Sequence, residues 1–233
     1  MPFGQRESLD QYNFALDVLL PQNCLLCDSP AARHPLCRAC EAALPRLPAR
    51  CPVCAMPSTG SLICGSCQRK PPAFDATLAA LPYLFPVDRL IGAFKFHARL
   101  QLAPWFAALL APLVPSVNAL IALPLHRTRL AERGFNQAHE VARRLALLTR
   151  TPLLIRGLVR TRQTDEQSRL PPGARARNVR GAFHCGSSLA GNTVALVDDV
   201  MTTGATLEEC ARTLKRAGAE RVVNVVIART LPD

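Results

Sequence analysis

Runs of consecutive apolar residues alternate along this chain with stretches in which apolar residues recur at helical spacing. Thr193–Val197 has an apolar or Thr side chain at every position, which is typical of a strand buried on both faces of a parallel sheet. Asn118–Leu123 and Arg221–Ala228 have a similar pattern, and Ala76–Phe85 has it with an interruption at Pro82. The pattern therefore predicts an α/β domain built around a parallel sheet.

A helix is predicted after three of these strands, because apolar residues return every three or four positions. The first covers Val87–Phe96 and has an apolar face made by Leu90, Ile91 and Phe94. The second has its apolar face at Ala138, Val141, Ala142, Leu145 and Leu148. The third has it at Leu207, Cys210, Ala211 and Leu214, and it ends at Gly218. Residues 8–20 also have helical spacing and predict a short packing helix.

One apolar stretch is long enough to be considered as a membrane span. Phe106–Leu125 contains no charged residue. However, Pro112, Pro115 and Pro124 divide it into a short helix and a strand, so a transmembrane helix is rejected. The N-terminus has acidic residues among its apolar ones, which does not fit a secretory signal. We therefore expect a soluble, cytoplasmic protein.

Two carboxylates, Asp198 and Asp199, follow the predicted strand at Thr193–Val197, and a turn of small residues leads from them into the helix. The turn residues are Thr202, Thr203, Gly204, Ala205 and Thr206. Backbone N–H groups of such a turn, the helix dipole and Thr hydroxyls together favour an anion. Like charges repel, so the carboxylates suit sugar hydroxyls or a hydrated Mg²⁺ beside the anion. The alternative is an ordinary strand-to-helix turn with two solvated carboxylates.

Charge is distributed unevenly along the chain. The formal net charge is +11, although only 19% of the residues are charged and 49% are hydrophobic. Residues 126–180 contain 13 Arg and four acidic residues, and the loop predicted after Leu123 contains Arg127, Arg129 and Arg133. A concentrated basic segment favours contact with phosphate or nucleic acid. A solvated basic loop is the alternative.

Eight of the ten cysteines form four CxxC pairs, and the second four repeat the first four with a constant offset of 27 residues. The pairs are Cys24 and Cys27, Cys37 and Cys40, Cys51 and Cys54, and Cys64 and Cys67. Two CxxC knuckles complete one tetrahedral Zn²⁺ site, so four predict two structural sites with four cysteine ligands each. Neighbouring pairs are assumed to share a metal, although crossed ligation is also compatible with the spacing. A disulfide framework is the rival interpretation, and it would require an oxidising compartment.

Three parts follow along the chain from these patterns. Residues 1–23 form the packing helix, residues 24–70 the double zinc ribbon and residues 71–233 the α/β domain. The segment Arg69-Lys70-Pro71-Pro72 is interpreted as the linker between the last two. Lys95, within Phe94-Lys95-Phe96, is either a surface lysine or a ligand contact.

The acidic pair with its Thr-rich turn resembles the ribose-5-phosphate signature of the type I phosphoribosyltransferases. Pro124-Leu125-His126 and Glu132-Arg133-Gly134-Phe135-Asn136-Gln137-Ala138 are similar to the ComF family, which includes the competence protein ComFC and GntX-like relatives. That family joins a zinc ribbon to a phosphoribosyltransferase-like domain and is implicated in the uptake of transforming DNA. Segments within residues 160–183 resemble the family's loop that closes over the ligand.

The resemblance implies binding of phosphoribosyl pyrophosphate (PRPP) with Mg²⁺, as substrate or as ligand. Asp198 and Asp199 would then bind the ribose hydroxyls and the metal, and residues 202–206 would bind the 5-phosphate. Arg127, Arg129 and Arg133 would bind the pyrophosphate. The reaction of such an enzyme is displacement of pyrophosphate at the anomeric carbon.

A second function class stays open at this point, namely a non-catalytic protein that binds single-stranded DNA or senses PRPP. The Arg-rich segment favours it, whereas an aromatic content of only 5% does not, because single-strand binding uses stacking side chains. Other competence proteins are possible partners under either interpretation. The acceptor in a transferase reaction is not indicated by any residue pattern.

Overall fold

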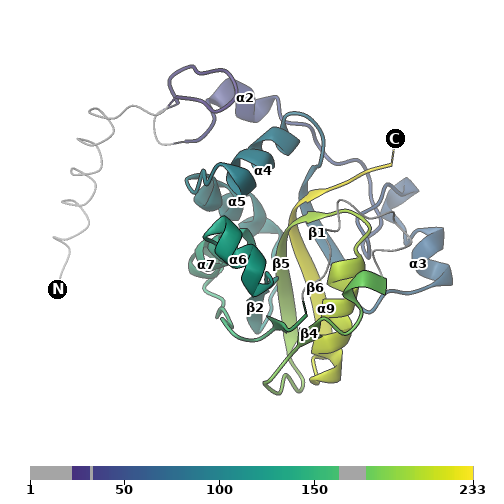
Figure 1. The fold of residues 1–233 in the computed structure, drawn as a ribbon. Helices are drawn as coiled ribbons and strands as arrows, with labels where there is room; N and C mark the ends of the chain where they lie inside the picture. Colours follow the sequence, from purple (N-terminus) through teal and green to yellow (C-terminus); the bar gives the residue numbers. More distant parts are fainter. Residues whose placement is uncertain (1–22, 32–33, 163–176, 233) are drawn as a thin grey trace, which may run out of the picture. The chain divides into compact units, whose positions relative to one another are not determined.

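A computed structural model describes residues 23–31, 34–162 and 177–232, and these fold as two compact units (Figure 1). The first unit belongs to residues 1–44, and the second to residues 45–233. The predicted helix at residues 8–20 lies outside the described residues. The first unit contains the first four CxxC cysteines and helix α2 (Arg38–Ala42).

The second unit is built on a parallel sheet of four strands, as the apolar runs predicted. The strands lie in the order β1 (Ala76–Pro82), β6 (Arg221–Arg229), β5 (Thr193–Met201) and β2 (Ala119–Ala122). Each neighbouring pair is parallel. The carboxyl ends of all four strands therefore lie at one edge of the sheet, which is where ligands bind in open α/β folds.

Helices cover both faces of this sheet (Figure 1). Helices α4 (Val87–Phe96), α5 (Leu102–Leu110) and α7 (Gln137–Thr149) lie on one face, and α9 (Ala205–Arg216) lies on the other. Alternate residues of a strand point to opposite faces, so Val194 and Leu196 pack in the same core cluster as the apolar face of α9. A 3-10 turn, η2 (Ala111–Leu113), follows α5.

Strand β5 is longer than the sequence predicted. It continues beyond Val197 because β6 pairs with it as far as Met201, opposite Arg229. Asp198 and Asp199 therefore lie inside a paired strand and are only 8% and 5% exposed. The sequence placed both carboxylates after the strand, at an end expected to be exposed, and the structure corrects this placement.

The second set of CxxC cysteines belongs to the second compact unit, together with η1 (Thr59–Ser61) and α3 (Gly65–Arg69). Ala55 is fully buried in the core cluster of that unit, and Thr77 in β1 donates its N–H to the carbonyl of Pro52 at 3.1 Å. The boundary between the compact units thus falls between the two cysteine sets, whereas the sequence placed a linker at residues 69–72. The physical reason is burial of the Cys51–Cys54 knuckle against the sheet, which no local pattern indicates.

The polar loop predicted after β2 contains a short helix, α6 (Arg127–Arg133), whose N-cap is His126 and whose C-cap is Gly134. Two further strands, β3 (Val159–Arg160) and β4 (Phe183–His184), form a separate antiparallel pair. Residues 163–176 of the predicted closing loop lie outside the described residues. Among the helices that the structure describes, none has the length and apolar character needed to cross a bilayer.

Candidate functional site

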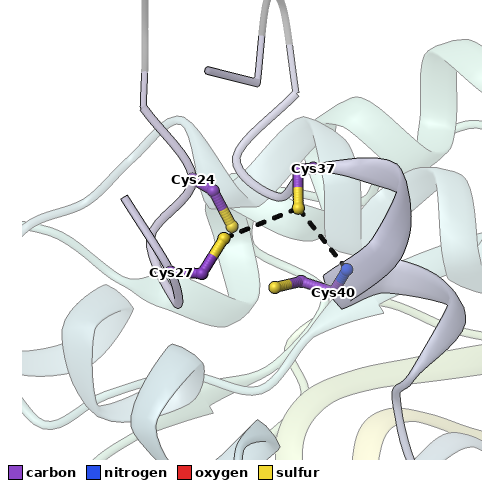
Figure 2. A group of neighbouring side chains, drawn as sticks. All are labelled: Cys24, Cys27, Cys37 and Cys40. Carbon is purple, nitrogen blue, oxygen red and sulfur yellow. Dashed lines mark hydrogen bonds between the residues drawn. The ribbon is translucent and has the colours of Figure 1, made fainter. Parts of the chain in front are cut away.

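The first cysteine set converges as one group of four thiols (Figure 2). The four Sγ atoms of Cys24, Cys27, Cys37 and Cys40 lie within 4.8 Å of one another. The sulfurs of Cys27 and Cys37 are 3.6 Å apart, close to the separation of about 3.8 Å that a tetrahedral zinc with Zn–S bonds of about 2.3 Å requires. The backbone N–H of Cys40 points at the sulfur of Cys37 at 3.5 Å, which favours a thiolate there.

The second set forms an equivalent group from Cys51, Cys54, Cys64 and Cys67. The sulfurs of Cys54 and Cys64 are 3.6 Å apart, and the N–H of Cys64 donates to the sulfur of Cys51 at 3.3 Å. Burial raises the pKa of Cys51, but hydrogen bonds from the backbone of Cys64 and its own knuckle outweigh this and lower it to about 7. None of the ten cysteines takes part in a disulfide. Each group of four thiols consists of two CxxC pairs that are neighbours in the sequence, as predicted, and the two groups are zinc-binding sites with four cysteine ligands each.

A cavity of about 320 Å³ opens at the carboxyl edge of the parallel sheet. Its walls come from the ends of β2 and β5, the start of α9, and helices α4, α6 and α7. The polar side chains along it are Tyr83, Lys95, His126, Arg129, Arg133, Gln137, Arg160, Asp198, Asp199, Thr202, Thr203 and Thr206. The acidic pair, the Thr-rich turn and two of the three predicted arginines thus meet around one space.

Asp199 has a contact on each carboxylate oxygen. Lys95 Nζ lies 2.8 Å from Oδ1, and Gln137 Nε2 donates to Oδ2 at 2.8 Å. Burial lowers the pKa of Lys95, but the charge of Asp199 outweighs it, and the pKa of the lysine is raised. Lys95 is therefore a half-buried cation paired with Asp199 and not a solvated surface lysine, whereas its contact with a ligand stays a prediction.

Helix positions explain how these two partners reach Asp199. Phe94 is fully buried and packs against Phe106 at 5.6 Å between ring centroids, which fixes the last turn of α4 and the lysine next to it. Asn136 caps α7 and also donates to the carbonyl of Leu123 at the end of β2, so the first residue of α7, Gln137, faces the sheet edge. Gln137 was not predicted as a site residue, because a polar residue at the start of a helix usually signals only a cap.

Asp198 has different surroundings from its neighbour. Its Oδ1 accepts a hydrogen bond from the N–H of Asp199 at 2.8 Å. Burial raises the pKa of Asp198 to about 8, and the charge of Asp199 adds to the effect. The carboxyl therefore keeps its proton to a higher pH than an exposed aspartate does.

The Thr-rich turn forms the N-terminus of α9. Gly204 is the residue before the helix and has a φ of +79°, a left-handed conformation that suits glycine. No side chain caps the helix from this position, and the hydroxyl of Thr203 accepts from the N–H of Ala205 at a long 3.4 Å. The start of α9 lies at the cavity, and the N-terminus of a helix favours an anion through its N–H groups and its dipole.

The predicted arginines fall into two groups. Arg129 and Arg133 line the cavity, whereas Arg127 is exposed at the start of α6 and is not among the lining residues. Arg160 in β3 also lines it, although it had no predicted role. The guanidinium of Arg133 lies 5.4 Å from the ring centre of Phe96, which is 66% exposed.

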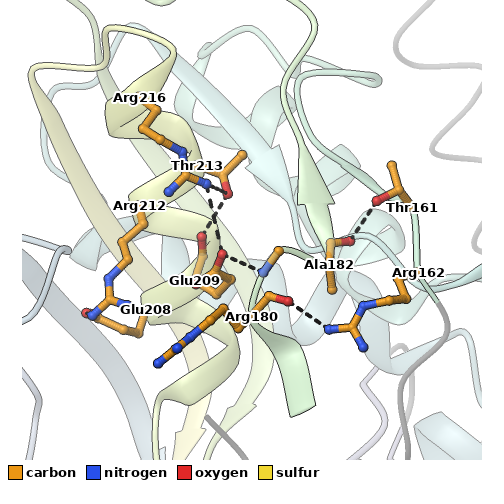
Figure 3. A network of polar contacts seen from close by, with 10 residues as sticks. Thr161, Arg162, Arg180, Ala182, Glu208, Glu209, Arg212, Thr213 and Arg216 are labelled. Carbon is orange, nitrogen blue, oxygen red and sulfur yellow. Dashed lines mark hydrogen bonds and ion pairs between the residues drawn. The ribbon is translucent and has the colours of Figure 1, made fainter. Parts of the chain in front are cut away.

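The residues on both sides of segment 163–176 are fixed by hydrogen bonds (Figure 3). Arg162 donates to the carbonyls of Asn178 and Arg180 at 3.1 and 2.7 Å. The buried carboxylate of Glu209 in α9 accepts from the N–H of Gly181 at 2.9 Å. The ends of the segment that resembles the closing loop are therefore anchored to each other and to α9.

The sheet with a helix terminus and acidic pair at its carboxyl edge defines a phosphoribosyltransferase-type domain, here preceded in the chain by two zinc-binding sites. Comparison with known families agrees: residues 15–68 match the double zinc ribbon domain and residues 130–231 match the phosphoribosyl transferase domain.

Sequence relatives from three bacteria identify the family. The chain is 32% identical to the DNA utilization protein YhgH of Salmonella typhi, over 92% of this chain and all of the relative. It is 30% identical to competence protein F of Haemophilus influenzae, over 82% of this chain and 89% of that one. With competence protein ComFC of Bacillus subtilis the identity is 26%, over 84% and 72% of the two chains. The chain belongs to the ComF family.

Proposed function

We propose that the cavity at the carboxyl edge binds PRPP together with Mg²⁺. The observation that carries this proposal is the convergence on one cavity of an open helix terminus, a buried acidic pair and three arginines. A molecule that fits must have an anionic group, adjacent hydroxyls and a second, more highly charged anionic group. PRPP has these three features in its 5-phosphate, its ribose and its pyrophosphate.

Each part of PRPP has a matching set of residues in this proposal. The turn at residues 202–206 would bind the 5-phosphate through backbone N–H groups and Thr hydroxyls. Asp198 and the side-chain carbonyl oxygen of Gln137 would accept from the ribose hydroxyls. Gln137 is only 5% exposed, and its Oε1 has no hydrogen-bond partner among the described residues, so a ligand hydroxyl would satisfy it. Arg129, Arg133 and Arg160 would neutralise the pyrophosphate.

The acidic pair also fits Mg²⁺, which prefers carboxylate, phosphate and water oxygens. The two carboxylates are buried side by side and Lys95 contacts only Asp199, so a cation bound beside Asp198 would offset the repulsion between the two charges when Asp198 ionises. When bound, Mg²⁺ would supply charge neutralisation on the departing pyrophosphate.

The proposed chemistry is transfer of the phosphoribosyl group. The bond between the anomeric carbon and the pyrophosphate oxygen would break, a bond to the acceptor would form, and the acceptor would lose its proton. The arginines would stabilise the negative charge that develops on the leaving group. The names of the relatives, which refer to DNA utilization and competence, lead us to place this activity in DNA uptake.

Binding of single-stranded DNA is the second candidate function. The exposed ring of Phe96 with the guanidinium of Arg133 beside it offers a base one stacking surface and one cation. Arg129 lies in the same helix as Arg133 and adds a second positive charge. This arrangement favours contact with a base and its phosphates without reading the base sequence.

Calorimetry with PRPP tests the first proposal. We expect binding that requires Mg²⁺, with ribose 5-phosphate weaker because it lacks the pyrophosphate. Asp198→Asn combined with Asp199→Asn should weaken PRPP binding at least about tenfold, since each lost charge-assisted contact is worth about 1.5–3 kcal/mol. Glu220→Gln, which removes an exposed carboxylate before β6, is the control and should bind like the wild type. Absence of PRPP binding by the wild type would overturn the proposal.

A salt titration of single-stranded DNA binding tests the second candidate. Arg129→Ala with Arg133→Ala should reduce the slope of log affinity against log salt by about 1.4, if each contact contributes about 0.7. Arg143→Ala with Arg144→Ala, two exposed arginines of α7, makes the same change in charge and should leave the slope unchanged. An equal slope in both double variants would exclude helix α6 as the DNA contact.

A further inference from the structure

Arg229, the last residue of β6, is a buried cation whose role in the molecule is not explained by the site described above. Its side chain is only 4% exposed. One terminal nitrogen donates to the carbonyls of Met201 at 2.8 Å, Thr202, and Thr230 at 2.9 Å. The Nε group donates to the carbonyl of Cys54 at 2.9 Å. All four partners are backbone carbonyl oxygens.

Two of these carbonyls belong to the start of the phosphate-binding turn. Met201 is the last residue of β5 and Thr202 is the first residue of the turn. The side chain of Met201 also packs beneath Gly204, so close that a Cβ on residue 204 would lie 2.6 Å from the Met201 methyl group. Holding Met201 and Thr202 therefore fixes the path of the turn and the direction of its N–H groups.

The fourth carbonyl belongs to a ligand of the second zinc site. Cys54 is the second cysteine of its knuckle, and Ala55 after it is fully buried in the core of the same unit. The backbone of the Cys51–Cys54 turn is ordered when both thiolates bind a metal together with the other two ligands of the set. One guanidinium thus connects a zinc ligand to the phosphate turn across residues far apart in the sequence.

We propose that Arg229 is a positioning residue that couples the second zinc site to the phosphate-binding turn. Occupancy of the second zinc site, and not of the first, then sets the affinity of the turn for a sugar phosphate. The inference rests on the proposed function, because it assigns the turn to the 5-phosphate. By linkage the effect is reciprocal, so a bound sugar phosphate tightens zinc binding at the second site.

An arginine is required for this role because the guanidinium presents several N–H donors in a fixed plane. A lysine has a single nitrogen and can reach only part of the set. Arg229→Lys should therefore retain part of the coupling, and Arg229→Met, which has no donor, should lose it. The buried carbonyls left without a donor in Arg229→Met also make that variant the less stable of the two.

Selective loss of one ligand distinguishes positioning from general damage. We expect Arg229→Met and Arg229→Lys to bind ribose 5-phosphate about tenfold and about threefold more weakly than the wild type. Pyrophosphate, which would meet Arg129 and Arg133, should bind both variants like the wild type. Arg212→Met, which removes an exposed arginine paired with Glu208 on α9, is the matched control. Equal weakening of both ligands would indicate a structural role only and would overturn the inference.

Zinc affinity provides the reciprocal measurement. Cys40→Ser removes a ligand of the first site, so chelator competition on this variant reports the second zinc alone. Saturating ribose 5-phosphate should raise the chelator concentration needed to remove that zinc severalfold, and adding Arg229→Lys should reduce the shift. No shift in Cys40→Ser, although ribose 5-phosphate binds, would contradict the coupling.

Amide hydrogen exchange separates a failure of this inference from a failure of the proposed function. Removal of the second zinc, or Arg229→Lys, should increase exchange at residues 202–206 without any ligand present. If the wild type binds neither ribose 5-phosphate nor PRPP but exchange increases, the coupling stands and the proposed ligand is wrong. Unchanged exchange in both cases overturns the coupling itself.

Discussion

Asp198 and Asp199 are neighbours in one strand, yet opposite faces of the strand give them different chemistry. Asp199 contacts Lys95 and Gln137 and is charge-balanced. Asp198 has a backbone N–H for a partner, and burial raises its pKa to about 8. The site therefore contains one carboxylate that is paired with a cation and one whose pKa is raised by its burial.

This difference predicts a pH-dependent contribution of Asp198 to stability. The folded pKa is above the unfolded value of about 3.9, so the folded state keeps a proton that the unfolded state has lost. Asp198 should thus lower the free energy of unfolding by up to about 1.4 kcal/mol per pH unit as the pH rises from about 4 to about 8.

Comparison of Asp198→Asn with the wild type isolates this effect. The free energy of unfolding of the variant, relative to that of the wild type, should increase as the pH rises from about 4 to about 8. Urea unfolding at several pH values measures this difference. Asp75→Asn would be a poor control because that carboxylate has its own structural partners, so Glu220→Gln is used. A constant stability difference between Asp198→Asn and the wild type from pH 5 to pH 8 would contradict the assignment.

At the scale of elements, the junction of β5 and α9 carries the proposed phosphate site. The strand ends at Met201, the turn passes through a left-handed glycine, and the helix begins at Ala205. The three parts depend on one another. The strand fixes the first carbonyls of the turn, and the left-handed backbone of Gly204 sets the direction in which the helix starts beside the cavity.

Gly204→Ala should therefore affect both stability and binding. A left-handed alanine costs about 1–2 kcal/mol, and the Met201 methyl group must also move away. Gly191→Ala has the same backbone cost, since Gly191 has a φ of +71° and nothing within 4 Å of its Cβ position. Gly204→Ala should lose at least as much stability as Gly191→Ala in thermal unfolding, and only Gly204→Ala should weaken ribose 5-phosphate binding. Equal binding by both would show that the turn does not carry the phosphate.

Several elements could be predicted from the sequence because one local period defines them. Helix α4 has the predicted bounds, and the sheet consists of the four strands that the apolar runs indicated. Helix α6 was not predicted, because its apolar residues are too few to show a period. Lys95 and Gln137 reach Asp199 through the packing of α4 and α7. Packing between elements that are distant in the chain cannot be predicted from the local spacing of residues.

The whole molecule contains two zinc sites with different structural settings. The first belongs to a compact unit of its own, whereas the second is part of the core of the α/β unit. The two sets look equivalent in the sequence, since their spacings are identical. Only contacts with residues far along the chain, such as Thr77 and Arg229, distinguish them.

Loss of one ligand from each set should therefore have unequal effects. Cys51→Ser should lose one zinc and lower the melting temperature of the α/β unit, because Cys51 is fully buried and its knuckle packs on the sheet. Cys24→Ser, the equivalent change in the first set, should also lose one zinc and leave that melting temperature unchanged. Elemental analysis and calorimetric melting measure both quantities. Equal melting temperatures in the two variants would mean that the Cys51–Cys54 knuckle does not support the sheet.

The position of β6 between β1 and β5 has a consequence for synthesis on the ribosome. Strand β1 ends at Pro82, yet its hydrogen-bonded neighbour in the sheet begins at Arg221. The nascent chain must therefore expose β1 and the second cysteine set while most of the α/β unit is still being translated. The first zinc unit can close early, but the apolar edge of β1 needs protection from other nascent chains until β6 emerges.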